Sequence, residues 1–402
     1  MVPAQTGSIS VGLADSHVHF GCASRFEELE LYLESNQVSE IGLLSLPDAR
    51  RINFNPEVLF ARAKLAGRSR AFASFDYADR FQTVAGGVGE KLTAIPIEEQ
   101  VEIYARAGFD GLKLWEGKPT FQQLYTTAID DESFSGAFRA AARFSMPVVL
   151  HVADPPIFWN TAPGAGPENR LGWSASGAIE TGQGLPSFEE LMRQTVAVLD
   201  RNPDCVLIFP HMLFLAGDLG RLSALLEAHG NAFLDLSPGL YFYGELHRQH
   251  NAAVDFFNTY RERILFGSDG MWFCDGLSHL PQSDLEANSE RTARLLKFLR
   301  TTEELENPFA YTRAEIPVIR GLGLPGETIH AICRTNFRDR IWGAKGWGKT
   351  PMQADRDIGG RGTVEYLRGF LQRLRTLTSD VSAPAYRSAE WVTRYFDPQG
   401  NR

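Results

Sequence analysis

The chain has 402 residues, of which 44% are hydrophobic and 22% are charged, a composition typical of a globular protein with a large core. Its net charge is −9, from 40 basic and 49 acidic residues, and no basic cluster is present, which argues against general binding of nucleic acids. Residues 1–12 lack the pattern of a signal peptide, and no apolar run approaches the ~20 residues needed to span a membrane.

The cysteines give a second prediction. Cys22, Cys205, Cys274 and Cys333 lie far apart in the chain and show no C-x-x-C spacing. This distribution predicts neither a disulfide framework nor a zinc site made of cysteines. Together with the absence of a leader pattern, it favours a cytoplasmic enzyme in a reducing compartment.

Short apolar runs of β type alternate with segments of helical period along most of the chain. The runs cover residues 12–20, 40–46, 70–77, 111–115, 147–152, 205–211, 232–236 and 264–268. The helical segments cover residues 26–34, 57–66, 97–107, 134–144, 188–200, 219–229, 254–260 and 284–299. Regular alternation of this kind predicts an α/β protein with a parallel sheet, and eight units favour a closed (β/α)8 TIM barrel over an open doubly wound sheet.

Two connections that follow predicted strands are unusually long. Residues 77–96 include a glycine-rich stretch at 86–89, and residues 154–186 are rich in glycine, proline and aromatic residues, among them Phe158, Trp159 and Trp173. Long loops of this kind are usually functional or disordered, and exposed aromatic residues disfavour disorder. We therefore expect the second loop to cover the substrate.

The pattern changes beyond residue 300. Helical periods cover residues 325–334 and 363–377, the stretch 344–362 is polar and glycine-rich like a linker, and the chain ends polar. We assign residues 1–343 to a catalytic barrel domain. We expect residues 344–402 to be a helical extension that packs on the barrel or on the second subunit of a homodimer.

The sequence Asp15-Ser16-His17-Val18-His19 ends the first apolar run. Alternate side chains of a strand share one face, so His17 and His19 are expected to point the same way. Two imidazoles on one rigid element are the beginning of a divalent metal site. The alternative is a pair of histidines that are only hydrogen-bonded within the strand.

Three further polar residues stand at or near the ends of later predicted strands, namely His151, His211 and Asp269. In a closed barrel the carboxyl ends of the strands meet on one face, where barrel enzymes build their active sites. A histidine or aspartate after a buried strand needs hydrogen-bond partners or a cation. Each is a candidate metal ligand or acid–base group, with a satisfied core histidine or a helix N-cap as the alternatives.

Lys113 lies in the middle of the fourth apolar run. A lysine inside a barrel is desolvated, which lowers its pKa. Three roles are open: pairing with a carboxylate, binding an anionic substrate, or carbamylation that bridges two metal ions. Glu116 is a weaker candidate for a metal ligand, Lys118 for a contact with substrate or solvent, and Asp235 for a residue that orients a neighbour.

The whole set resembles the metal site of the amidohydrolase superfamily. In detail it is similar to the amidohydrolase-related branch, which includes aminocarboxymuconate-semialdehyde decarboxylase, other decarboxylases, lactonases and hydrolases. The likeness runs from about residue 12 to residue 343. Its supporting segments are residues 110–114, 263–269, 324–327 and 335–337.

The resemblance implies a set of roles for these residues. His17, His19, His151 and Asp269 would hold a divalent metal, with zinc as the first choice and manganese or iron as alternatives. His211 would act as the acid–base group or ligate a second metal ion. Some superfamily members hold two ions through a carbamylated lysine on the fourth strand. Lys113 therefore leaves the number open, although one ion is favoured.

The leading hypothesis is a metal-dependent hydrolase that cleaves an amide, a lactone or a related C–N or C–O bond of a small molecule through a metal-activated water. In it, Asp269 takes or orients the water's proton, and His211 stabilises the carbonyl charge or protonates the leaving group. The alternative is a lyase that decarboxylates an aromatic or unsaturated acid on the same metal. A third hypothesis is a binding protein without catalysis. The sequence contains no G-x-S-x-G elbow, phosphate loop or H-E-x-x-H helix that would suggest another chemistry.

Overall fold

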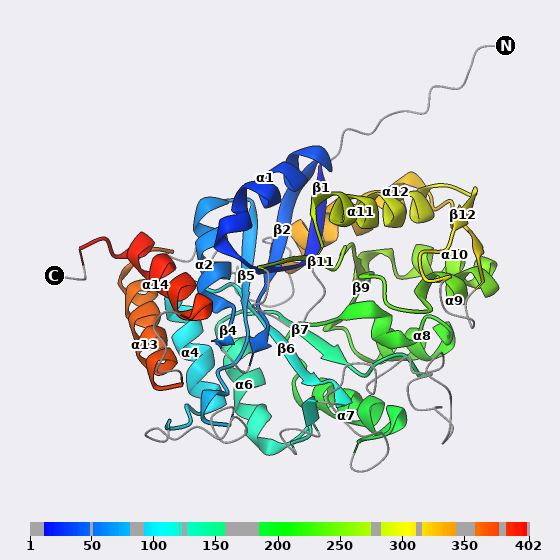
Figure 1. Cartoon of the computed structure of the whole chain (residues 1–402). Helices are drawn as coiled ribbons and strands as arrows, with labels where there is room; N and C mark the ends of the chain where they lie inside the picture. Colours follow the sequence, from blue (N-terminus) through cyan, green and yellow to red (C-terminus); the bar gives the residue numbers. More distant parts are fainter. Residues whose placement is uncertain are drawn as a thin grey trace, which may run out of the picture.

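The computed structural model shows a curled central sheet with helices packed around it (Figure 1). It describes residues 12–48, 51–80, 92–119, 121–122, 127–156, 185–274, 283–310, 316–342, 358–377 and 383–399. The predicted substrate-covering aromatic residues, Phe158, Trp159 and Trp173, and the glycines at 86–89 lie outside these ranges.

The sheet is parallel throughout and has the order β10-β9-β8-β7-β6-β5-β2-β1-β11. Its strands are β1 (Leu13–Gly21), β2 (Val38–Leu44), β5 (Ser69–Ala73), β6 (Gly111–Gly117), β7 (Val148–Val152), β8 (Leu207–Phe209), β9 (Ala232–Asp235), β10 (Ile264–Leu265) and β11 (Gly270–Phe273). Each predicted apolar run overlaps one of these strands, and β11 lies beyond the last run. Small antiparallel ribbons join β3 (Pro47–Asp48) to β4 (Ile52–Asn53), and β12 (Glu304–Glu306) to β13 (Val318–Arg320).

The last predicted strand is broken into two parts, which together close the barrel. β10 pairs with β9, whereas β11 pairs with β1. Between them, the backbone N–H of Ser16 donates to the carbonyl of Phe266 (2.9 Å), and the N–H of Asp269 donates to the carbonyl of His17 (3.0 Å). The two ends of the sheet therefore meet across one interrupted strand, and the predicted (β/α)8 barrel is confirmed.

The helices of the barrel are α1 (Phe26–Ser35), α2 (Asn55–Lys64), α4 (Ile97–Ala107), α6 (Glu132–Arg143), α7 (Phe188–Arg201), α8 (Leu219–Ala228), α9 (Phe242–Arg248), α10 (His250–Thr259) and α11 (Leu285–Arg300). Helix α7 illustrates why they form. The hydroxyl of Ser187 caps its first turn by accepting from the N–H of Glu190 (3.1 Å), and Leu191 and Val198 belong to its buried face. No helix in the described ranges is both long and apolar enough to cross a membrane.

The amino-terminal end of the barrel is closed by residues that follow α12 (Gly326–His330). A π-helix, η6 (Ala331–Ile341), places Phe337, Ile341 and Trp342 in one buried cluster with apolar side chains of the strands. The side-chain amide of Asn336 donates to the carbonyls of Arg261 (2.6 Å) and Ile264 (2.7 Å). This segment therefore both fills and hydrogen-bonds that end of the barrel.

The chain ends in two helices that cover one side of the barrel, α13 (Arg361–Leu377) and α14 (Pro384–Phe396) (Figure 1). The hydroxyl of Thr363 on α13 donates to the carbonyl of Ala107 on α4 (2.8 Å). Helix α14, which is amphipathic, was not among the predicted helical segments. Tyr386, Ala389 and Val392 recur every three residues and are buried.

Candidate metal centre

Three predicted ligands meet at the carboxyl-terminal end of the barrel, which we call the mouth. The Nε2 atoms of His17 and His19 lie 3.2 Å apart. The Oδ1 atom of Asp269 lies 3.5 Å from the first and 3.4 Å from the second. Ligand atoms in a tetrahedral zinc site with bonds of about 2.0–2.1 Å lie about 3.4 Å apart. These three atoms, which we call the ligand triad, therefore fit one divalent ion.

The position of Asp269 depends on the break in the eighth strand. Its backbone has φ = 56°, in the left-handed region that L-residues rarely adopt, and its N–H is held by the carbonyl of His17. Gly267 makes the close approach between the first and last strands possible. A Cβ atom added there would lie 2.8 Å from the Cβ of His17. The strand break and the glycine together bring the carboxylate to the histidines.

Asp235, at the end of β9, is the residue that orients His17. Its Oδ2 atom accepts a hydrogen bond from Nδ1 of His17 (2.7 Å), and its Oδ1 accepts from the N–H of Ser237 (2.8 Å) and from the Ser237 hydroxyl. Burial alone would raise the pKa of Asp235, but the charge and hydrogen bond of His17 outweigh it and lower that pKa to about 2. With its proton on Nδ1, His17 keeps the lone pair of Nε2 for the triad.

His19 is buried and neutral. Its pKa is lowered to about 4, chiefly because burial disfavours the imidazolium. Among the described residues, its Nδ1 atom has no hydrogen-bond partner. The ring stacks on Phe273 at a centroid distance of 6.3 Å. A neutral imidazole short of partners is suited to coordinate a cation through Nε2.

His151 and His211 lie beside the ligand triad but supply no atom to it. Their rings are 5.0 Å apart, and that of His211 is 6.0 Å from His17. Nε2 of His151 is 3.0 Å from the carbonyl of Ala153, and Nδ1 of His211 is 2.9 Å from the carbonyl of Ser237. Burial lowers both pKa values. Each of these two nitrogens donates its proton to the carbonyl beside it. In the neutral rings the lone pair is therefore on the other nitrogen, Nδ1 of His151 and Nε2 of His211. A ligand role for His151 stays a prediction.

Lys113 lies inside the barrel next to the triad. Its ammonium nitrogen is 3.5 Å from Nε2 of His17. Burial lowers its pKa to about 8, while the carboxylates of Asp235 and Asp269 act in the opposite direction. The side chain of Lys113 therefore loses its proton more readily than an ordinary lysine.

Two weaker candidates lie apart from the triad. Oε1 of Glu116 accepts a hydrogen bond from the hydroxyl of Tyr77 (2.6 Å), and burial raises the pKa of Glu116 to about 7. Lys118 forms an ion pair with Asp154 at 2.5 Å. Neither residue supplies an atom to the triad.

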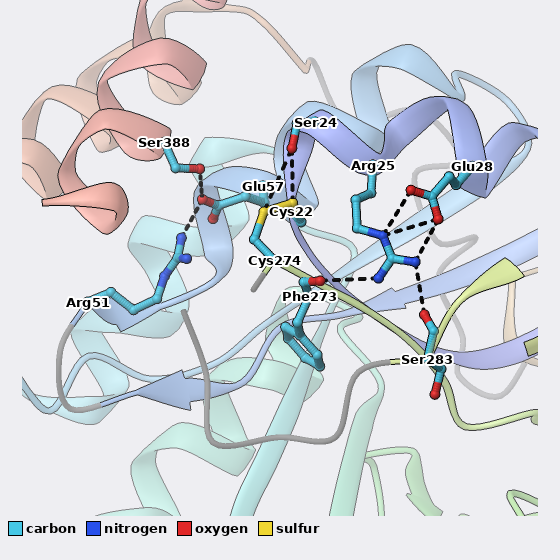
Figure 2. The surroundings of a disulfide bond; sticks show 10 residues. All are labelled: Cys22, Ser24, Arg25, Glu28, Arg51, Glu57, Phe273, Cys274, Ser283 and Ser388. Atoms are coloured by element: carbon cyan, nitrogen blue, oxygen red, sulfur yellow. Dashed lines mark hydrogen bonds and ion pairs between the residues drawn. A yellow bond between two sulfur atoms is a disulfide. The ribbon is translucent and has the colours of Figure 1, made fainter. Parts of the chain in front are cut away.

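A disulfide joins Cys22 to Cys274 at the mouth (Figure 2), so the prediction of unpaired cysteines is wrong. The two residues are separated by 252 positions, but Gly21 pairs with Phe273 between β1 and β11, so the cysteines follow as neighbours with Cα atoms 5.2 Å apart. Cys205 is buried and unpaired. The disulfide removes the cysteine spacing as an argument for a reducing compartment.

Arg25 connects the same region (Figure 2). Its guanidinium donates to the carbonyls of Phe273 (3.1 Å) and Ser283 (2.9 Å) and pairs with Glu28 (2.7 Å). The disulfide and this arginine therefore both fix the chain that leaves β11, close to Asp269.

Comparison with known protein families covers the residues of this site. A sequence profile of the Amidohydrolase family matches residues 14–336, a range that contains the whole ligand triad. The chain belongs to the amidohydrolase family. No curated protein matches it.

Solved structures that resemble this amidohydrolase are distant in sequence. An amidohydrolase II structure is 15% identical, covers 81% of this chain and 98% of its own, and has a TM-score of 0.46. A TIM-barrel protein from Bordetella bronchiseptica is 12% identical, with 81% and 97% covered and a TM-score of 0.45. The complex of 2,6-dihydroxybenzoate decarboxylase with 2,6-dihydroxybenzoate is 14% identical, with 82% and 98% covered and a TM-score of 0.44. Family membership rests on the sequence profile.

Proposed function

We propose that this amidohydrolase is a metal-dependent hydrolase that cleaves an amide, a lactone or a related C–N or C–O bond of a small molecule. The observation that carries the proposal is the ligand triad: two imidazoles and a carboxylate with facing atoms 3.2–3.5 Å apart. Zinc is the first choice for the ion, with manganese and iron as alternatives. One ion with His151 as a further ligand is favoured over two.

The neighbouring side chains divide the work of hydrolysis. A divalent ion, when bound, supplies a Lewis acid that makes water nucleophilic near neutral pH. Asp269 orients the attacking water and accepts its proton. Water can reach this carboxylate from the mouth, since its side chain is 17% exposed. His211 holds its Nδ1 proton on the Ser237 carbonyl, which leaves Nε2 to accept a proton; once protonated, Nε2 stabilises the substrate carbonyl or protonates the leaving group.

Lys113 favours a second candidate function. A buried ammonium group 3.5 Å from the triad suits an anionic substrate, such as an aromatic or unsaturated carboxylic acid. The same residues would then support non-oxidative decarboxylation, in which a protonated side chain delivers a proton to carbon as carbon dioxide leaves. Lys113→Met tests this role, since it removes the charge and retains most of the volume.

The decisive experiment measures metal and turnover in the same samples. His17→Ala should lose bound metal, by elemental analysis, together with activity in a screen of amides, lactones and aromatic acids. The control is His229→Ala. This histidine pairs with Asp200 and supplies no atom to the ligand triad. Incorporation of oxygen from labelled water identifies a hydrolase, and release of carbon dioxide identifies a decarboxylase. Full activity in metal-free protein would refute both.

A further inference from the structure

A cavity of about 330 Å³ borders His211 and is formed by residues that follow β8 and β9, with Pro156 from the segment after β7. Its walls include Phe214, Ala216, Leu240 and Phe242. None of these side chains belongs to the ligand triad. The cavity therefore offers space for a part of a substrate that the metal and its ligands do not touch.

An unusual backbone turn places Phe214 in this wall. His211, Met212, Leu213 and Phe214 have φ values of 57°, 49°, 56° and 54°, so four consecutive L-residues adopt the left-handed conformation. Such a turn repeats every three residues, which brings the first and fourth side chains to the same side. The rings of His211 and Phe214 accordingly stack at a centroid distance of 4.9 Å and an angle of 27°.

Gly239, which also lines the cavity, leaves room for the Phe214 ring. A Cβ atom added to Gly239 would lie 2.8 Å from Cε1 of Phe214 and 3.6 Å from Cβ of His211. Any larger residue at 239 would push the phenyl ring away from the histidine. The turn after β8 and the glycine after β9 therefore maintain the same feature, an aromatic face in contact with a candidate acid–base residue.

The charges at the rim are matched. Arg248 forms an ion pair with Glu245 at 2.6 Å, and both residues line the cavity together with Leu240. The cavity thus combines an apolar wall with an internally compensated ion pair, which suits a neutral group more than a charged one. Apolar cavities of about 150 Å³ hold one benzene molecule, so this volume admits a substituted single ring.

We propose that this cavity, the aromatic subsite, binds a neutral aromatic ring of the substrate against Phe214 and so selects aryl substrates. That the ring is part of a substrate rests on the proposed function. The reactive carbonyl or carboxyl group would extend from the ring past His211 toward the triad. Phe214 and Leu240 are then specificity-determining residues.

Binding of a simple probe tests the subsite without any turnover. Benzyl alcohol, which is neutral, should bind to the full-length protein in ligand-observed NMR, with or without added zinc. Phe214→Ala should weaken that binding by about tenfold, because it removes both the stacking and the apolar contact. Leu240→Trp should abolish it by filling the cavity. Trp391→Ala, which removes an exposed aromatic residue of α14, should leave it unchanged.

Cyclohexylmethanol is the matched probe for the aromatic part of the proposal. It should bind to the wild type more weakly than benzyl alcohol does. The two alcohols should bind equally weakly to Phe214→Leu, which lacks the aromatic ring. This variant keeps an apolar side chain and replaces Phe214→Ala if that variant fails to fold. Benzyl alcohol binding that is absent, or insensitive to both positions, overturns the subsite. Loss of the proposed metal chemistry would instead appear as metal-free, inactive protein that still binds the probe.

Discussion

At its amino-terminal end the barrel is filled by apolar side chains, whereas at its mouth the same strands present buried imidazoles, carboxylates and an ammonium group. Phe337, Ile341 and Trp342 occupy the first region, and the ligand triad with Lys113 occupies the second. Burial of apolar surface stabilises the fold, while burial of ionisable groups opposes it unless they are paired. The apolar end therefore stabilises the fold, whereas the mouth holds the ionisable groups that chemistry needs at a cost in stability.

The two ends of the barrel also differ in backbone conformation, and the strained residues gather at the mouth. Non-glycine residues with left-handed backbone follow strands at the mouth, namely Ala153, the four residues 211–214, Tyr241 and Asp269, and Ile52 has the same conformation within β4. Such residues cost about 1–3 kcal/mol each and persist where the surrounding structure holds them. At the other end, Gln37 and Ser145 are single turn residues that precede strands. The strain at the mouth brings two of the candidate catalytic residues, His211 and Asp269, into position.

The largest effects should come from a pair of substitutions, one at each end. Phe337→Ala should lower the free energy of unfolding by about 3–5 kcal/mol, because it leaves a cavity in a closed region. The folded fraction should still bind metal. His17→Ala should lose the metal, whatever its effect on the stability of the metal-free protein, because it removes one member of the ligand triad. Urea unfolding and elemental analysis of both variants check this, and metal loss in Phe337→Ala at full folding would contradict the division of roles.

Removal of the disulfide should follow in size. The double variant Cys22→Ser/Cys274→Ser should be less stable by about 2–4 kcal/mol, since a crosslink over 252 residues restricts the unfolded chain. Metal should also dissociate faster, because the crosslink joins β1 and β11 just beyond His19 and Asp269. A dithiol reductant provides the control. It should destabilise the wild type to the level of the double variant and leave that variant unchanged.

Glu116 should make stability depend on pH. Its pKa is about 7 in the folded state against an ordinary 4.5, so the folded protein binds more protons than the unfolded chain between these values. The free energy of unfolding should therefore fall as pH rises through this window, by up to about 3 kcal/mol. Glu116→Gln stays neutral and should be more stable than the wild type at pH 8 but equal at pH 4. Glu132→Gln, at an exposed position, should show no such difference.

Much of the fold could be predicted from the sequence because the barrel is built from local patterns. Alternation of apolar runs and helical periods is a short-range signal, and it located every strand of the central sheet except β11. The spacing of His17 and His19 is equally local, since a strand fixes which side chains share a face. Asp269 was identified because it directly follows an apolar run.

The features that the sequence analysis missed all depend on contacts between distant residues. The break in the eighth strand arises because β10 pairs with β9 while β11 pairs with β1. The same pairing aligns Cys22 with Cys274, which no spacing rule detects. The left-handed turn at 210–214 follows a proline in a run that resembles an ordinary strand end. In α14, charged residues between the buried positions hide the apolar face from a composition-based judgement.

The smallest effect expected here tests whether Asp235 acts through His17. Asp235→Asn removes the carboxylate that accepts from Nδ1 of His17, so the lone pair of Nε2 is no longer held on the triad. Loss of such a partner typically weakens metal binding about 10–100-fold. The chain offers a matched control in Asp200, a largely exposed aspartate 3.8 Å from His229. Asp200→Asn should leave the metal dissociation constant unchanged in a chelator competition. Equal affinity in both variants would show that the metal does not depend on His17 being held in one tautomer.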